Sequence, residues 1–396
     1  MFCSVTEAEG HGGRGRGAAV RTPNRRWTRA VGYTLGGVLV LGAAGGGWAY
    51  WHLDGNIRSV DIDAALGDDR PHAPVGMPVG TGEPSPESGA RDGGGGALDI
   101  LVLGSDSRDG EENHRLGGGD ASGGARSDTA MVVHLDEGRT SATVVSIPRD
   151  TLVTRPACPL PEGGSTAVAH GVMFNSAYAV GGPVCAVKTV EAMTGLPVDH
   201  YLEIDFAGFA DLVDALGGVT VEVEQSIDDD RSHLHIEAGV HRLHGEQALA
   251  LARTRHGVGD GSDLGRIGLQ QKLVKALLEE VTRAELLTDP VRLYRVADAA
   301  TSGLTADTGL DSLEELAAFG QSLRGLPPEG VRTVTLPVVP APADRNRVVP
   351  DEPEAGELWA SLLPGADPAG PEPEVSSSPG GRSTVPSTGL SALSSQ

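Results

Sequence analysis

Short apolar runs alternate with amphipathic stretches along the middle of the chain, and this pattern predicts its secondary structure. Runs of β-branched and aliphatic residues bounded by turn residues indicate strands at Leu98–Leu103, Thr129–Leu135, Ala142–Ile147, Tyr201–Ile204, Val219–Val223 and Thr333–Val338. Apolar residues spaced three and four apart indicate helices at Pro183–Met193, Phe206–Leu216, Gly245–Arg253, Gly265–Arg283 and Glu354–Leu363. Strands that alternate with helices predict one α/β domain over residues 97–363.

An uncharged and largely apolar stretch, Ala30–Trp51, predicts a single transmembrane helix. As a helix, its 22 residues would span about 33 Å, which is enough to cross a bilayer. The 29 residues before it carry six arginines and no lysine. Because positive charge stays in the cytoplasm, we expect a cytoplasmic basic tail (1–29), one span (30–51) and an extracytoplasmic domain. A cleaved signal peptide is the alternative, but Trp48 and Trp51 would crowd its cleavage site.

Composition sets the outer limits of the domain. Residues 52–96 are rich in Pro and Gly and lack apolar periodicity, so we expect a linker there. Residues 364–396 are rich in Pro, Ser and Gly, which predicts a disordered tail. Beyond residue 29 the chain carries 25 basic and 52 acidic residues, a formal charge of −27. So acidic a region argues against nonspecific binding of nucleic acid.

Two cysteines, Cys158 and Cys185, fall in the region predicted to be extracytoplasmic, whereas Cys3 falls in the cytoplasmic tail. An even pair in an oxidising compartment favours a disulfide between them. Two buried free thiols are the alternative.

Two carboxylates lie at neighbouring strand ends. Asp106 follows the first predicted strand, and Asp128 directly precedes the second. Such a pair can share Mg²⁺ (or Mn²⁺), with phosphate oxygens and water as further ligands. Aspartates beside Gly and Ser are also common turn residues, so the pattern alone leaves both interpretations open.

Arginines gather at the ends of other elements. Arg149 follows a strand that ends in Ser-Ile-Pro, and Arg253 and Arg255 stand two apart at the end of an alanine-rich helix. Guanidinium groups suit the oxygens of a polyanion such as pyrophosphate. The alternatives are a surface pair of Arg149 with Asp150 or Asp136 and, for the other two, cations that stabilise a helix C-terminus.

The next predicted helix begins with a similar set. Arg266 and Gln270 are four residues apart and therefore share one helix face, and Asp263 could orient the neighbouring arginines. The numerous histidines lack a metal-site spacing with carboxylates, so we interpret them as surface residues or as histidines that are satisfied by hydrogen bonds; they are His233, His235, His241, His244 and His256.

Several short motifs carry a family resemblance. They are Gly104–Arg108, Arg126–Thr129, Ser146–Asp150, Asn175–Tyr178, Gly181–Pro183, Val187–Val190, Asp205–Phe206, Leu216–Val219 and the stretch from Arg253 to Gln271. Together they resemble the LytR-CpsA-Psr family of cell-wall enzymes over about Leu98–Glu280. Leu269 departs from the pattern, because many members have an arginine there, and the loop Asp109–Ala125 is long and rich in glycine.

The resemblance implies a fold and an activity. The fold is a central mixed β-sheet flanked by helices, with an apolar tunnel for a polyprenyl chain. The activity is a phosphotransferase in cell-wall biogenesis, which moves a glycopolymer such as teichoic acid from a polyprenyl-pyrophosphate carrier to peptidoglycan and forms a phosphodiester. A hydrolase acting on the same lipid, and a noncatalytic protein that binds the lipid carrier or the glycan, are the alternatives.

The resemblance also implies roles for single residues. Asp106 and Asp128 would hold the Mg²⁺. The pyrophosphate would be bound by Arg149, Lys188, Arg253, Arg255 and Arg266, with Arg108 and Arg126 as further substrate contacts. Asp263 and Gln270 would orient these groups or touch the phosphate.

Overall fold

The computed structural model describes residues 43–67, 70–71, 96–105, 127–160, 163–254, 263–283 and 289–363 of the 396-residue chain. For Asp128, Asp263 and Leu264 it describes the backbone alone. Both the predicted basic tail and the predicted C-terminal tail lie outside these residues.

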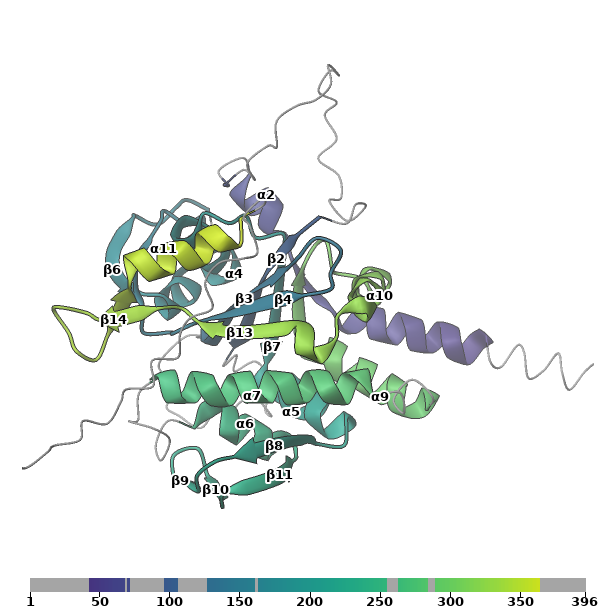
Figure 1. Cartoon of the computed structure of the whole chain (residues 1–396). Helices are drawn as coiled ribbons and strands as arrows, with labels where there is room; N and C mark the ends of the chain where they lie inside the picture. The colour runs from purple at the N-terminus through teal and green to yellow at the C-terminus, as the bar shows by residue number, and fades with distance from the viewer. Residues whose placement is uncertain are drawn as a thin grey trace, which may run out of the picture.

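A seven-stranded mixed sheet forms the centre of the molecule (Figure 1). Its strands, in spatial order, are β1 (Arg58–Val60), β12 (Leu304–Asp307), β7 (His200–Asp205), β2 (Leu98–Ser105), β3 (Ser127–Leu135), β4 (Ala142–Ile147) and β13 (Val331–Thr335). The pairs β2–β3, β3–β4 and β7–β12 are antiparallel, whereas β2–β7, β4–β13 and β1–β12 are parallel. The expected central mixed sheet is confirmed.

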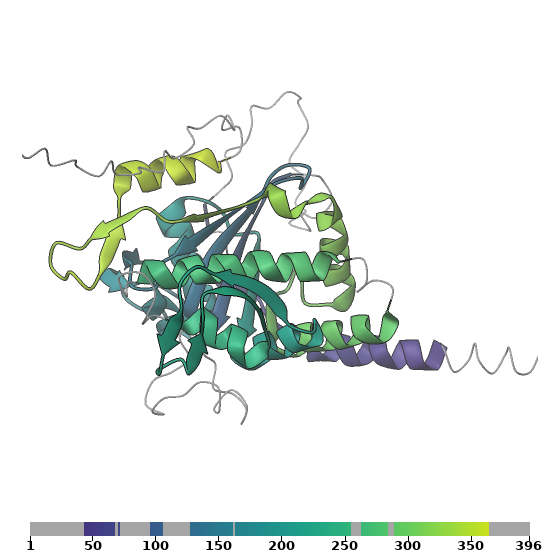
Figure 2. The ribbon, with the colours of Figure 1, turned by 60° about the horizontal axis from the view of Figure 1, so that its bottom comes forward.

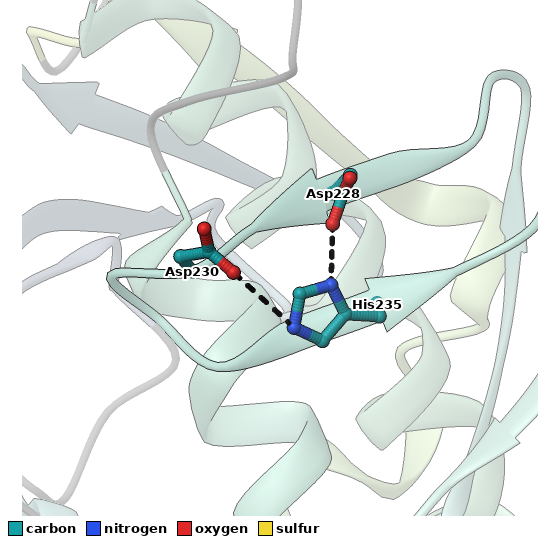
Figure 3. Close-up of side chains that lie close together, drawn as sticks. All are labelled: Asp228, Asp230 and His235. Carbon is teal, nitrogen blue, oxygen red and sulfur yellow. Dashed lines mark hydrogen bonds and ion pairs between the residues drawn. The ribbon is translucent and has the colours of Figure 1, made fainter.

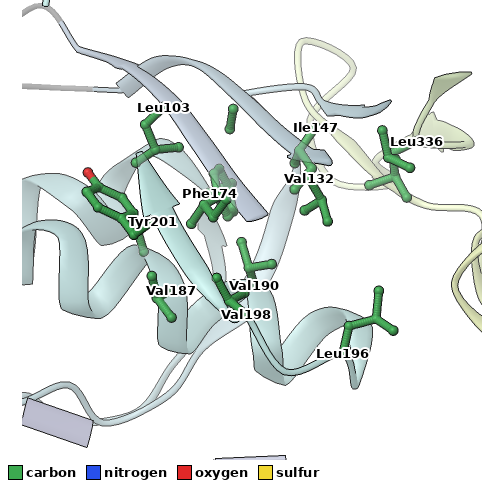
Figure 4. Close-up of a cluster of buried hydrophobic side chains, with 14 of the residues drawn as sticks. Leu103, Val132, Ile147, Phe174, Val187, Val190, Leu196, Val198, Tyr201 and Leu336 are labelled. Atoms are coloured by element: carbon green, nitrogen blue, oxygen red, sulfur yellow. The ribbon is translucent and has the colours of Figure 1, made fainter. Parts of the chain in front are cut away.

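Helices cover both faces of the sheet (Figure 1). On one face lie α2 (Ile62–Leu66), α4 (Asn175–Thr194) and α11 (Glu352–Ser361), and on the other lie α7 (Asp263–Thr282) and α10 (Leu313–Ser322). The α4 face is tightly packed: Leu101, Leu103 and Val132 are at most 1% exposed, and Figure 4 shows Leu103 and Val132 with their neighbours. The central strands β2, β3 and β4 are near-continuous apolar runs, so successive side chains can pack on both faces of the sheet.

A smaller layer packs against the outer side of α7 (Figure 2). It contains α5 (Phe206–Ala215), α6 (Gly245–Arg253) and two hairpins, one of β8 (Val219–Val223) with β11 (Gly239–Leu243) and one of β9 (Ile227–Asp229) with β10 (Leu234–Ile236). The remaining elements are α9 (Pro290–Ser302) and the hairpins of β5 (Leu152–Arg155) with β6 (Ala169–Met173) and β14 (Val338–Pro340) with β15 (Val348–Pro350).

Two predicted segments contain structure that the sequence did not indicate. The helix expected from Pro183 is the second part of α4: the backbone of Gly181 and Gly182 is not helical, with φ of 62° at Gly182, and a further helical segment from Asn175 precedes them. The segment 52–96, expected to be a linker, contains β1 and α2. Among the described residues, no helix combines the length and the apolar character needed to cross a bilayer.

Candidate functional site

One edge of the central sheet collects the ends of four strands. Ser105, the last residue of β2, is paired with Asp205 at the end of β7 and with Ser127 at the start of β3. On the far side of β3, Ala130 is opposite Ile147, so Arg149 lies just beyond the same edge. Three of the predicted site residues, Asp106, Asp128 and Arg149, therefore lie in sequence at or directly after the strand ends that meet here.

The β2–β3 pair contains a bulge at this edge. Gly104 is opposite Thr129 and Ser105 is opposite Ser127, so Asp128 is the extra residue that has no opposite partner in β2. Bulges of this kind turn the local backbone and are common beside active sites. Glycine suits position 104, since a Cβ atom there would lie 3.3 Å from the Thr129 Cβ, closer than an ordinary contact.

Gln270 joins α7 to this edge. Its side-chain amide donates to Thr129 Oγ1 and to the Ala252 carbonyl, both at 2.9 Å, and the residue is only 7% exposed. One residue later, Gln271 makes longer contacts of 3.4 Å to Ser146 Oγ and 3.3 Å to Thr335 Oγ1. A single turn of α7 is thus tied to β3, β4, β13 and α6.

Arg266 and Arg253 are brought to the same place by these contacts. Arg266 lies one turn before Gln270 on α7 and is 2% exposed, and burial of a guanidinium is costly unless its charge is compensated. Arg253 ends α6 directly after Ala252, and its guanidinium carbon lies 5.0 Å from the centre of the Phe206 ring. This cation–π contact holds Arg253 beside the end of β7.

Arg149 has only a weak contact with the acidic neighbour that the sequence suggested. Its Nε atom is 3.7 Å from Asp150 Oδ2. Asp150 instead accepts a hydrogen bond of 2.7 Å from Arg347. The surface pair considered for Arg149 is therefore not its dominant interaction.

Lys188 lies apart from the α7 residues. It is half-buried on α4, which covers the opposite face of the sheet. One turn earlier on α4, Cys185 forms a disulfide with Cys158, with a Cα–Cα distance of 5.2 Å. The disulfide fastens α4 to the loop that follows β5.

Leu269 faces away from Gln270 and into an apolar cluster. It is 6% exposed and packs with Leu273 and with the valines of β8. Successive helical residues point about 100° apart, so this position is oriented towards the outer layer and not towards the strand ends.

A buried carboxylate near the edge was not predicted. Glu203, two residues before the end of β7, is 6% exposed and accepts hydrogen bonds from Tyr178 (2.7 Å) and from Tyr201. Burial, together with the Glu203 charge, raises the pKa of the Tyr201 hydroxyl well above its usual range, so it remains a donor. Tyr178 belongs to one of the motifs, but no spacing in the sequence indicated its partner.

Arg58 is a second residue that sequence reasoning missed. It lies in β1 and its Nη2 is 2.8 Å from Asp205 Oδ2. Asp205 also caps α5 by accepting from the Gly208 amide at 2.8 Å. A Cβ atom on Gly208 would come within 2.4 Å of Gly303, so glycine allows α5 to begin at this edge.

Several predicted site residues are not placed. Asp106, Arg108, Arg126 and Arg255 lie outside the described residues.

A group of three metal-ligating side chains lies on the β9–β10 hairpin (Figure 3). Asp228 and His235 are opposite each other in the hairpin, and Asp230 follows β9. The two ring nitrogens of His235 face different carboxylates, Asp228 at Nδ1 and Asp230 at Nε2, and all three residues are exposed. This is the arrangement of a surface ion pair, which agrees with the interpretation of this histidine from sequence.

Comparison with known proteins gives a consistent result. The chain is 36% identical over 268 residues to the probable cell wall biosynthesis protein LcpB of Corynebacterium glutamicum, a match that covers 66% of this chain and 60% of that protein. It is 32% identical over 197 residues to the polyisoprenyl-teichoic acid–peptidoglycan teichoic acid transferase TagV of Bacillus subtilis, covering 48% of this chain and 47% of that protein. The match thus spans less than two thirds of either relative.

A solved structure supports the same relationship. The LytR-Csp2A-Psr enzyme from Actinomyces oris superposes with a TM-score of 0.51 and 25% identity, covering 67% of this chain and 89% of that one. The sequence model of the LytR_cpsA_psr family matches residues 50–362, which include every strand of the central sheet. The chain therefore belongs to the LytR_cpsA_psr family.

Proposed function

We propose that this protein transfers a glycopolymer from a polyprenyl-pyrophosphate carrier to peptidoglycan and leaves a phosphodiester between them. The observation that carries the proposal is the meeting of Arg253, Arg266 and Gln270 with the bulged backbone of Asp128 at one sheet edge. The name of the Bacillus subtilis relative, a teichoic acid transferase, supports the same reaction class.

The reaction needs stabilisation of charge more than it needs a protein nucleophile. The hydroxyl oxygen of the acceptor attacks the phosphorus that carries the glycan, and the bond from this phosphorus to the bridging oxygen breaks. The hydroxyl proton is released, and the lipid monophosphate leaves. Arg253 and Arg266 would stabilise the negative charge on the phosphate oxygens, and their fixed positions would cost little reorganisation during the reaction.

A divalent ion fits the residues at this edge. β2 ends directly before Asp106, and the residue paired with that end, Ser127, is directly followed by Asp128. Two carboxylates at this point, with no thiol or imidazole in the predicted set, suit Mg²⁺ or Mn²⁺. When bound, the ion would neutralise pyrophosphate charge. Asp106 and Asp128 would hold it, and the arginines would orient the substrate beside it.

The sheet face beneath α7 suits the lipid. Its apolar side chains are incompletely covered: Val102, Met131, Val133 and Leu202 are all half-buried although they lie on central strands. On the α4 face, the neighbouring Leu101 is completely buried. A polyprenyl chain placed between the sheet and α7 would cover this apolar surface, which favours binding by about 0.8 kcal/mol per buried CH₂.

The same proposal includes anchoring in the membrane by residues 30–51, with the domain on the extracytoplasmic side. It rests on the uncharged run and on the arginine excess before it. Protease added outside intact protoplasts should degrade the domain, and full protection would contradict this topology.

A product assay tests the activity. The full chain is incubated with lipid-linked glycan labelled in the sugar, together with peptidoglycan. Label on peptidoglycan supports transfer. Label released as water-soluble glycan phosphate indicates a hydrolase, and label retained on the lipid indicates a binding protein; either result refutes the transfer.

A further inference from the structure

Two helices extend side by side from the domain. Residues 43–56 are helical, and their last turns contact α9: His52 Nε2 is 3.2 Å from Asp298 Oδ1, and Asn56 Nδ2 is 3.1 Å from the same oxygen and 3.4 Å from Thr301 Oγ1. Because the chain order 52 to 56 matches the order 298 to 301, the two helices run parallel. Figures 1 and 2 both show the helix 43–56 and α9 pointing away from the domain in the same direction.

The outer ends of these two helices are apolar and exposed. Trp48 is 61% exposed and Trp51 is 78% exposed on the helix 43–56, while Val291 is 60% and Leu293 is 40% exposed on α9. With a rise of about 1.5 Å per residue, Val291 lies roughly 10 Å before Asp298 and is level with the first turn of the helix 43–56. Large apolar side chains that are exposed near one another mark a surface that contacts a membrane or another protein.

We propose that the first turns of α9, together with Trp48 and Trp51, form a surface that rests in the membrane interface. The proposal depends on the proposed membrane anchor, since the helix 43–56 begins inside the uncharged run Ala30–Trp51. If that run crosses the bilayer, its tryptophans lie among the head groups. Parallel packing from the His52–Asp298 contact then places Val291 and Leu293 within about 5 Å of the depth of Trp48.

The sequence of α9 fits this position. Its start alternates apolar and basic or aromatic residues, Val-Arg-Leu-Tyr-Arg, from Val291 to Arg295. Because α9 runs parallel to the proposed anchor, only its first turns would reach the interface. Arg292 donates to the Leu216 carbonyl, whereas the exposed Arg295 would extend to the head groups and Val291 and Leu293 to the acyl region.

The surface would fix the orientation of the site. Asp54 accepts a hydrogen bond of 2.9 Å from the Leu313 amide at the start of α10, so the helix 43–56 is held by α9 and α10. The chain then passes through Ile57 into β1, where Arg58 bonds Asp205 at the site edge. With two contacts on the bilayer, the domain could not rotate about its anchor, and the strand ends would stay at one height above the lipid.

Labelling of the full chain in vesicles tests the proposal. With Cys3 replaced by Ser, single cysteines are introduced as Val291→Cys and, as a control, Val168→Cys, and each is coupled to an environment-sensitive fluorophore. Val168 is a valine of similar exposure, 52%, and it directly precedes β6, which Figure 1 shows on the side of the domain away from α9. Leu39→Cys, within the uncharged run, reports on the anchor. The vesicles contain phosphatidylcholine and phosphatidylglycerol, with and without lipids that carry a quencher at the acyl chain.

We expect quenching by the lipid at positions 291 and 39 and none at position 168. Quenching at 39 with a water-like signal at 291 would overturn the resting surface and leave the anchor intact. Absence of quenching at both positions would refute the anchor, and the resting surface with it. A shifted emission at 291 without lipid quenching would show that a protein, such as a second copy, covers the surface, and would also overturn the proposal.

Activity provides an independent test. The double variant Val291→Glu with Leu293→Glu should reduce transfer from vesicle-embedded substrate several-fold, whereas transfer from a short-chain, water-soluble substrate should be unchanged. Val168→Glu should affect neither. Equal loss with both substrates would indicate damage to the fold and contradict the proposed role.

Discussion

Gln270 is expected to be the residue that couples the stability of α7 to activity. Replacement by Leu keeps the approximate volume but removes two buried hydrogen bonds, to Thr129 and to the Ala252 carbonyl. Each such bond contributes about 0.5–1.5 kcal/mol, and the carbonyl that remains buried adds a desolvation penalty. The expected loss is therefore about 2–3 kcal/mol.

The melting temperature measures this loss. For a domain of this size, about 1 kcal/mol corresponds to roughly 2–4 °C, so Gln270→Leu should lower Tm by about 4–12 °C. Gln271→Leu is the matched control on the same helix, because its contacts are longer, at 3.3 and 3.4 Å, and contribute less. Its Tm should fall by a smaller amount.

Transfer activity should separate the two variants further. Gln270 fixes the turn of α7 that carries Arg266, so Gln270→Leu should reduce turnover strongly at a temperature where the protein is still folded. Gln271→Leu should retain most of the activity. If Gln271→Leu is the more damaging change in both assays, the contact between Gln270 and β3 is not what positions the turn of α7 that carries Arg266.

Four further outcomes are expected. Arg253→Lys should not restore the turnover lost in Arg253→Ala, because Lys lacks the planar fork that binds two phosphate oxygens; full rescue would indicate simple charge attraction. EDTA should abolish transfer, and Asp128→Ala should do so with little change in Tm, whereas full activity in EDTA would exclude the metal. Cys185→Ser should destabilise the domain by about 3.5 kcal/mol, from loop-closure entropy over the 27-residue separation; peptide mapping that finds both thiols reactive would refute the disulfide. Burial alone would lower the pKa of His134, but its hydrogen bond to Asp99 raises the pKa above the usual 6.5, so stability should fall as pH rises through that value. His134→Gln should remove this slope, and an unchanged Tm profile in that variant would contradict the assignment.

The central strands β2, β3 and β4 could be predicted because each is a near-continuous apolar run, whereas β12 (Leu304–Asp307) was not predicted. Helices cover both faces of β2, β3 and β4, so these strands need apolar side chains at nearly every position. Their sequences contain such runs, which is why the strands could be recognised. β1 could not be found in this way, since its three residues contain one apolar side chain and its pairing with β12 depends on residues more than 240 positions later.

Prediction of the candidate site from sequence meets the same limit as prediction of β1. The strand ends and the helix face of Arg266 and Gln270 followed from local spacing. The contact between Gln270 and Thr129 joins residues 141 positions apart, and no local pattern determines it. The burial of Glu203 could not be predicted either, because an acidic residue in a strand normally faces solvent. Its burial depends on a hydrogen bond from Tyr178, which belongs to another element.

Leu269 shows how α7 serves two surfaces at once. Many members of the family have an arginine at this position, and from sequence its replacement by Leu suggested a missing polar contact. In the structure Leu269 packs with Leu273 and β8, while Gln270 beside it bonds the strand edge. An arginine at 269 would have to leave this apolar cluster or bury its charge there. The proposed phosphate contacts therefore depend on the turn that carries Arg266 and Gln270, and Leu269 holds that turn against the outer layer.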